Sequence, residues 1–331
     1  MPSLSNKQKG LMIVILGSLI FPFLMVSIGF EYAILIGCFF ELYLIAVNGM
    51  DVVFGYCGQI SMGHAAFYAI GAYGSALLHN KLGIPVVFTM IIASVIGALI
   101  GALIAFPASR LVFHFLSLAT IAFGEIVYQL ISHSPNNFTG NFNGLFTSRI
   151  NIFGLELKSS FSFYFFGLIC LALFLLAKHG IVNSRVGRAF IAIRENTHAA
   201  DGMGINVRKY KVIAFTISAF YTAFAGSMYA HLIGYISPDT FIQKQSVLFV
   251  TMLLFGGTTS LLGPALGVLS LLLLTEALRS LQDYQMIIYG ALLLLVIVAL
   301  PGGIYGGIKD IYGLIKGSIK RTMGGEKNAS S

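Results

Sequence analysis

Apolar runs, each about long enough to cross a bilayer, fill most of this 331-residue chain. A spanning helix needs about twenty apolar residues, because its backbone groups have no water to bond in lipid and must be satisfied within the helix. The pattern predicts an all-α polytopic membrane protein with about ten transmembrane helices. The ten runs are Leu11–Phe30, Ala33–Phe54, Ile60–Leu78, Ile84–Phe106, Leu111–Ile131, Phe161–Ala177, Val212–Ile233, Ser246–Gly263, Ala265–Leu278 and Gln285–Leu300.

One long polar segment, Lys178–Lys211, interrupts these runs in the middle of the chain. It carries seven Lys or Arg residues against Glu195 and Asp201. Short basic loops stay in the cytoplasm, so this loop is expected there. Its apolar positions follow 4, 3, 4, 3 spacing, which predicts one amphipathic helix about four turns long. Those positions are Val186, Phe190, Ile193, Thr197 and Ala200.

The predicted topology follows from the distribution of basic residues. With ten spans and a cytoplasmic N-terminus, the Arg110 turn, the 178–211 loop and the basic C-terminal tail all emerge inside. The polar segment 133–160 then lies outside. Lys7 and Lys9 before the first run resemble a signal peptide, but the length of that run and the spans that follow favour a retained helix. We therefore expect one transmembrane domain over residues 1–318, a cytoplasmic polar tail over 319–331, and both termini in the cytoplasm.

Composition narrows the class of function. The chain is 57% hydrophobic and 10% charged, far too few charges for a soluble globular surface. Its net charge of +8 is concentrated in the 178–211 loop and at the two ends, so positive-inside topology explains it without nucleic-acid binding. The three cysteines and seven histidines lack metal-ligand spacing. The sequence contains no GxxxxGK[ST] phosphate loop and no GxSxG nucleophile motif. We expect no catalytic residues, no metal and no cofactor in this chain.

Small residues follow helical spacing in two of the runs. Ala93, Gly97, Gly101 and Ala105 in the fourth run predict a face where helices approach closely. The third run carries Gly58, Ser61, Ala65, Ala69, Ala72 and Ala76 at steps of three or four, with Gln59, Ser61 and His64 near its start. This arrangement fits either tight packing or a broken helix whose polar start faces a translocation path. The second half repeats the pattern faintly at Gly257 and Ser260.

Ionisable groups within apolar runs are costly in lipid, so each is a candidate for function. Glu41, Asn48 and Asp51 fall on one side of the second predicted helix. They would line an aqueous path or a proton relay, although Asp51 near the cytoplasmic end would also reach water. Glu125 in the fifth run is the leading buried carboxylate, with a structural hydrogen bond to another helix as the alternative. Glu276 and Arg279, three residues apart, are predicted to form an ion pair.

Five segments, in order, resemble the permease subunits of bacterial branched-chain amino-acid ABC importers. They are GYCGQISMGHAAFYAIGAYGSALL, LATIAFGEIV, GRAFIAIRENTHAADGMGINVRKYK, AFTISAFYTAFAGSMYAHLIGYISPDTF and GGTTSLLGPALG. The resemblance implies the type II, vitamin-B12-importer-like permease fold in the bacterial inner membrane. It also implies a second homologous permease or a second copy, two cytoplasmic ATPases that bind ATP and magnesium, an extracytoplasmic solute-binding protein, and membrane lipid around the bundle. The family's coupling element corresponds to Gly187–Gly204, with candidate ATPase-coupling residues Arg188, Arg194, Glu195, Ala199, Ala200 and Gly204.

The expected function is import of a small amino acid, most simply Leu, Ile or Val, by alternating access. One face of the loop helix would enter a groove of the partner ATPase. Candidate residues of the translocation path are Glu41, Asn48, Gln59, Ser61, His64 and Glu125. Alternatives are an ABC permease for urea, short amides or another small polar solute, and a proton-coupled secondary transporter using Glu41 or Glu125. A third alternative takes the loop helix as an interfacial lipid-binding helix without a partner.

Overall fold

The computed structural model describes residues 17–25, 32–109, 113–152, 155–157, 159–279, 284–299 and 302–307. Within the first predicted run, residues 17–25 are helical. The rest of that run, Arg110, and the tail with residues 319–331 lie outside the described residues.

Helices make up most of the described chain. The longer ones are α2 (Tyr32–Asp51), α3 (His64–Leu82), α4 (Val86–Ala108), α5 (Phe113–Ser132), α6 (Ser160–Asn183) and α9 (Val207–Ile233). The shorter ones are α7 (Arg185–Glu195), α8 (Thr197–Gly202), α10 (Gln243–Gly256), α11 (Leu262–Ala277) and α12 (Gln285–Ala299). A π-helix, η1 (Val52–Tyr56), continues α2.

Several of these helices can cross a membrane. Among the described residues, five stretches are long and apolar enough: Tyr32–Tyr56, Val86–Ala108, Phe115–Ser132, Ser160–Asn183 and Val207–Ile233. The prediction of a helical, multi-pass membrane protein is therefore confirmed. Several boundaries differ from the apolar runs. Helix α9 begins at Val207 instead of Val212, and α10 ends at Gly256 instead of Gly263. Helix α3 begins at His64 instead of Ile60, and α6 continues past Ala177 to Asn183.

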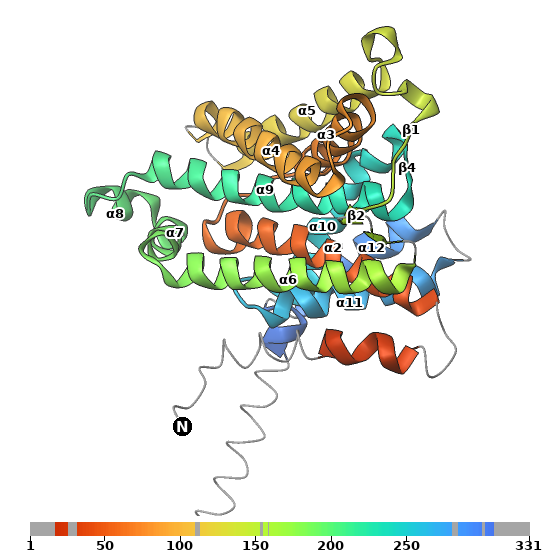
Figure 1. Ribbon diagram of the computed structural model, residues 1–331. Helices are drawn as coiled ribbons and strands as arrows, with labels where there is room; N and C mark the ends of the chain where they lie inside the picture. The colour runs from red at the N-terminus through yellow and green to blue at the C-terminus, as the bar shows by residue number, and fades with distance from the viewer. Residues whose placement is uncertain are drawn as a thin grey trace, which may run out of the picture.

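Helix α9 runs through the bundle and packs along α2, α3 and α4 (Figure 1). Its approach to α4 depends on the predicted stripe of small residues, which is buried. A Cβ added to Gly97 would lie 2.6 Å from the Cβ of Ala223, and one added to Gly101 would lie 2.6 Å from that of Ala219. Any larger residue at these two glycines would push the helices apart, which confirms the packing prediction for the fourth run.

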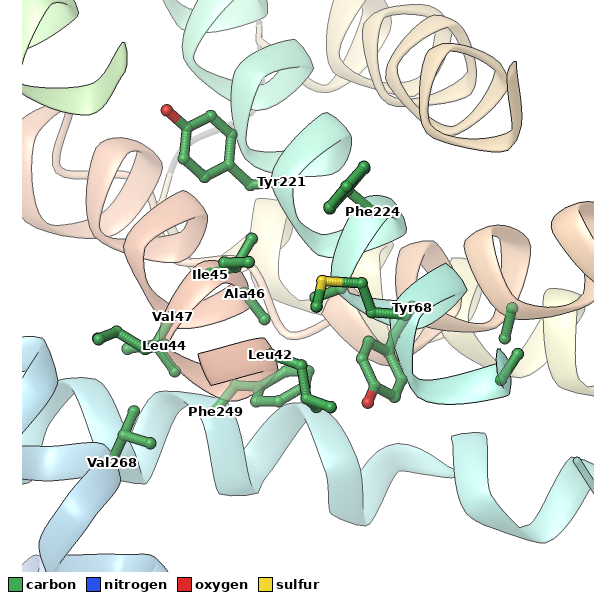
Figure 2. Packing of buried hydrophobic residues seen from close by; sticks show 14 of the residues in the cluster. Leu42, Leu44, Ile45, Ala46, Val47, Tyr68, Tyr221, Phe224, Phe249 and Val268 are labelled. Carbon is green, nitrogen blue, oxygen red and sulfur yellow. The ribbon is translucent and has the colours of Figure 1, made fainter. Parts of the chain in front are cut away.

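Helix α2 lies at the centre of the apolar core. Leu42, Leu44 and Ile45 pack among Tyr68 of α3, Tyr221 of α9, Phe249 of α10 and Val268 of α11 (Figure 2). Lipid tails are as apolar as these side chains, so dense van der Waals contact holds the helices together more than removal from water does. The core joins elements from both halves of the chain into one bundle.

The segment predicted to lie outside is ordered by short elements. They are the 3-10 turns η2 (Pro135–Asn137) and η3 (Asn141–Asn143), and the strands β1 (Leu145–Phe146), β2 (Asn151–Ile152) and β3 (Leu155–Glu156). Strand β1 pairs antiparallel with β4 (Tyr235–Ile236), which follows α9 and precedes the turn η4 (Pro238–Phe241), and β2 pairs with β3. The Thr147 hydroxyl donates to the Ala230 carbonyl. These bonds attach the 133–160 segment to the end of α9.

Candidate functional site

Between α6 and α9, the polar segment 178–211 folds into two helices and not one. Ser184 caps α7, its Oγ accepting from Val186 N at 3.1 Å. Asn196 then interrupts the helix with an extended backbone, and its Oδ1 accepts from the amides of His198 and Ala199 at 3.0 Å each. The prediction of one continuous helix is wrong, because an Asn cap starts a new helix within the apolar stripe.

The apolar stripe of α7 and α8 packs against its own chain. Phe190, Ile193 and Ala200 are buried in a cluster with Val52 of η1 and Phe215 of α9. The transmembrane bundle therefore covers this face, and docking of the unit in a groove of a partner stays a prediction for another face. A partner can only meet the opposite face.

That opposite face carries most of the candidate coupling residues. Arg188, Glu195, Ala199 and Gly204 are exposed on it, whereas Ala200 is buried and belongs to the inner face. Met203 beside them is 84% exposed. Arg194 is also exposed, but its Nη1 donates to the Gly55 carbonyl of η1 and so points toward the bundle. Gly204 has φ +82°, a left-handed backbone that glycine adopts without strain. Two residues that the motif places side by side, Ala199 and Ala200, thus face opposite ways.

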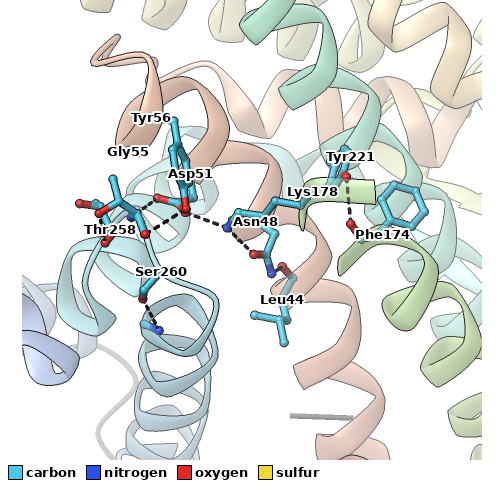
Figure 3. Close-up of polar contacts among 12 residues, drawn as sticks. Leu44, Asn48, Asp51, Gly55, Tyr56, Phe174, Lys178, Tyr221, Thr258 and Ser260 are labelled. Carbon is cyan, nitrogen blue, oxygen red and sulfur yellow. Dashed lines mark hydrogen bonds and ion pairs between the residues drawn. The ribbon is translucent and has the colours of Figure 1, made fainter. Parts of the chain in front are cut away.

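Lys178 does not belong to the cytoplasmic loop. It lies in α6, is fully buried, and its Nζ donates to Asn48 Oδ1 at 2.6 Å and to Asp51 Oδ2 at 2.7 Å (Figure 3). The alternative that Asp51 simply reaches water is wrong, because Asp51 is also fully buried. The spacing of Lys178 along the sequence indicates that it is buried, because it continues the buried face of α6 formed by Leu171, Leu175 and Val182.

The start of the third run is a break between two helices. After η1 the chain is non-helical from residue 58 to 63, and α3 then begins at His64. Gly58 has φ +70°, a conformation that favours glycine at this turn. Gln59 and Ser61 are buried in the break. Features of both alternatives for this run are present. The helix is broken at its start, and the small residues of α3 after the break pack tightly on α9.

Polar contacts tie the end of the break to three other helices. His64 Nε2 lies 2.7 Å from Ser218 Oγ of α9. Met62 N donates to Thr120 Oγ1 of α5 at 2.9 Å, and Gln243 of α10 donates from Nε2 to the Met62 carbonyl at 3.0 Å. The break is therefore a junction of α5, α9 and α10.

The predicted carboxylates have different surroundings from one another. Glu41 is fully buried, and neither of its carboxyl oxygens has a hydrogen-bond partner among the described residues. Glu125 is exposed, and Gln129 on the same helix donates to it at 2.7 Å. Among the described residues, then, Glu125 is neither buried nor bonded to another helix, because an apolar run shows depth in the membrane but not which face a residue occupies. Its role in the translocation path stays a prediction. Glu276 and Arg279 pair at 3.4 Å, as predicted.

A turn in the second half of the chain meets the break. It joins α10 to α11, and we call residues 257–261 the α10–α11 turn. Thr259 N in this turn donates to Asp51 Oδ1 at 2.9 Å, and the Tyr56 hydroxyl donates to the Thr259 carbonyl at 2.9 Å. The Gly257 and Ser260 that echo the third run thus lie in a segment bonded to the end of α2.

A cavity of about 280 Å³ lies apart from these groups, where the start of α10 meets α11 and α12. Its lining is Asp239, Thr240, Ile242, Lys244, Gln245, Val247, Leu248, Thr251, Thr275 and Tyr289. None of the six predicted path residues lines it.

A helical membrane bundle with a buried charge pair, a broken helix and a small exposed helical unit is the architecture of a multi-pass transport protein. The model of the family described as branched-chain amino acid transport system, permease component, matches residues 32–297. This chain belongs to that family. Its members are transport subunits and not enzymes.

Individual relatives cover most of the chain. It is 32% identical over 287 residues to the high-affinity branched-chain amino acid transport system permease protein LivM of Escherichia coli K12, covering 80% of this chain and 67% of the relative. It is 27% identical over 295 residues to LivH of the same strain, covering 80% and 91%. It is 23% identical over 314 residues to a probable LivM of Methanocaldococcus jannaschii, covering 80% and 90%. No solved structure matches this chain.

Proposed function

We propose that this chain is the permease subunit of an ATP-binding-cassette importer that moves a small amino acid, most simply Leu, Ile or Val, across the bacterial inner membrane. The observation that carries the proposal is the family match over residues 32–297, together with relatives named for branched-chain amino acids. The chain has no phosphate loop of its own, so two separate cytoplasmic ATPases supply the energy.

The proposed membrane arrangement has ten spans in the type II fold, with both termini in the cytoplasm. The basic residues Arg185, Arg188 and Arg194 of α7 support a cytoplasmic position for α7 and α8. The 133–160 segment and η4 then face outside, where a solute-binding protein delivers its ligand. Single-cysteine labelling checks the arrangement. A membrane-impermeant maleimide added to whole cells should label a cysteine at Asn143 and should leave one at Ala199 unlabelled.

The ATPases dock on the exposed face of α7 and α8, around Arg188, Glu195, Ala199 and Gly204. The buried stripe fixes this unit to the bundle, so a push on its outer face moves it as a rigid body. The outer face is the docking face because the bundle covers the apolar face. The same burial disfavours an interfacial lipid-binding helix, because the apolar residues that such a helix needs are already covered.

A second, related permease completes the pathway, with a second copy of this chain as the alternative. Two differently named permease proteins of one organism, LivM and LivH, both resemble this chain, which supports two related subunits. The exposed position of Glu125 also supports a second permease subunit. A carboxylate on the surface of a membrane helix is costly against lipid and is accommodated where a partner or an aqueous path covers it.

The decisive experiment reconstitutes this chain in proteoliposomes together with the ATPases and the binding protein that are encoded next to its own gene. Uptake of labelled leucine should require ATP and the binding protein. Uptake of urea or acetamide in place of leucine would favour the small-amide alternative. Uptake that follows a pH gradient without ATP, and is lost in Glu125→Gln, would favour the proton-coupled alternative.

Docking is tested by Glu195→Lys on the exposed face, with Asn143→Lys in the outer segment as the matched control. The first change should reduce co-purification of the ATPase, and the second should not. Equal retention of the ATPase by both variants would contradict docking at this face.

A further inference from the structure

The break between α2 and α3, here called the break segment (residues 52–63), is held from three directions by polar contacts. A π-helix and a non-helical stretch leave backbone groups outside the regular helical ladder, and such irregularities recur at functional sites in membrane proteins. In this chain the groups that hold the segment, and the end of α2 directly before it, come from the α7 helix, from α6 and from the α10–α11 turn.

The first contact comes from the coupling unit itself. Arg194 of α7 reaches back into the bundle, and its Nη1 donates to the Gly55 carbonyl at 2.5 Å. The stem of the same side chain packs on Gly58, where an added Cβ would lie 3.0 Å from Arg194 Cγ. Arg194 therefore joins the helix that a partner would push to the two glycines that shape the break.

The second contact is the buried charge pair. Asp51, the last residue of α2, accepts from Lys178 of α6 through Oδ2 and from Thr259 N through Oδ1 (Figure 3). Tyr56 at the other end of η1 donates to the carbonyl of the same Thr259. One carboxylate thus links α2, α6 and the α10–α11 turn, and the two bonds at Thr259 fix that turn against η1.

The far end of the break segment contacts three other helices. Met62 bonds to α5 and α10, and His64 bonds to α9. Because bonded elements with buried polar groups move together or lose those bonds, a shift of α7 displaces the break segment and reaches α5 and α10.

Resting on the proposed function, we infer that Arg194, Lys178 and Asp51 are positioning residues that transmit the movement of α7 into the break segment. They contact neither substrate nor ATPase in this role. Arg194 pulls the segment. Lys178 fixes Asp51, at the end of α2, to α6, and Asp51 and Tyr56 together hold the α10–α11 turn against the segment. Loss of either contact leaves a folded importer that hydrolyses ATP without matching transport.

The test measures leucine imported per ATP hydrolysed in proteoliposomes containing the whole importer. Arg194→Met keeps the apolar stem and removes the donor, Arg194→Lys keeps a donor, and Arg185→Met on the same helix is the matched control. Asp51→Asn with Lys178→Met keeps an acceptor for Thr259 N and removes the bond to α6. Melting temperature and ATPase co-purification are measured for every variant.

We expect Arg194→Met and the double variant to keep ATPase association and ATP hydrolysis. Their ratio of import to hydrolysis should fall about tenfold or more, the scale of one lost charge-assisted hydrogen bond. Arg194→Lys should retain most of the ratio, and Arg185→Met all of it. An unchanged ratio in folded Arg194→Met overturns the inference, and so does loss of ATPase association, which would place Arg194 in the docking surface. If the double variant does not fold, Arg194→Met alone decides. Failure of the proposed function is distinguishable from failure of this inference, because the unmodified importer would then not transport leucine.

Discussion

Replacing Lys178 by Met tests the buried charge pair most directly, because Met fills nearly the same volume without the charge. Lys178 Nζ lies 2.7 Å from Asp51 Oδ2, and both side chains are fully buried. At an effective dielectric constant of about 20, Coulomb's law gives about 6 kcal/mol of gross attraction at this distance. Desolvation of both groups offsets much of it.

Removal of one partner leaves the other charge buried and uncompensated. Lys178→Met leaves Asp51 with the single donor Thr259 N and leaves Asn48 Oδ1 without its donor. We expect the free energy of unfolding to fall by about 3–5 kcal/mol. In Lys178→Met with Asp51→Asn no charge is stranded, so the loss should be within about 1 kcal/mol. Lys209→Met, at an exposed position of α9, is the matched control and should change the free energy by less than about 0.5 kcal/mol.

The assay is unfolding by sodium dodecyl sulfate in mild detergent micelles. The chain has no tryptophan, so helix content by circular dichroism replaces intrinsic tryptophan fluorescence as the signal. A single variant that is as stable as the double variant would refute the reasoning, because it would mean that the Asp51 carboxyl is either accessible to water or uncharged.

Three further changes follow from the described contacts. Glu41→Met should raise the free energy of unfolding by about 1–3 kcal/mol, because it removes a buried carboxyl whose oxygens have no partner among the described residues; a drop in the same unfolding assay would show that a partner is present. Ala200→Asp should unfold or strongly destabilise the chain, whereas Ala199→Asp should leave its melting temperature unchanged and reduce only ATPase co-purification; similar melting temperatures for the two would contradict the opposite orientations. Gly101→Val should lower the free energy of unfolding by about 1–3 kcal/mol in the same titration, because it separates α4 from α9. Little change would contradict the close packing, in which an added Cβ lies 2.6 Å from the Cβ of Ala219.

Local periodicity predicted what depends on neighbours in the sequence. The apolar runs located the helices, and the small residues at Ala93, Gly97, Gly101 and Ala105 identified the face that meets α9. The stripe through Phe190 and Ile193 identified the buried face of α7. In each case the spacing sets which side chains share a face, and helical geometry carries that directly from sequence to structure.

The errors concern contacts between distant segments. Lys178 was assigned to the cytoplasm by its charge, since nothing near it in the sequence shows a carboxylate 127 residues away. Glu125 was expected inside the bundle because its run is apolar on all sides, and such a run does not distinguish an inner from an outer face. The end of α7 was missed because counting apolar positions does not register that Asn196 caps the next helix.

The charge pair between α2 and α6 also bears on how the chain is assembled. During synthesis α2 enters the membrane well before α6, since 127 residues separate Asp51 from Lys178. An Asp or Lys costs about 2.5–3.5 kcal/mol to insert at the centre of a spanning helix and less toward its end, where Asp51 and Lys178 lie, so each of these two helices carries part of that cost until the other arrives. The pair therefore makes stable placement of α2 depend on α6. A truncated or misthreaded chain would retain an unsatisfied charge in the membrane, a feature that quality-control proteases can recognise.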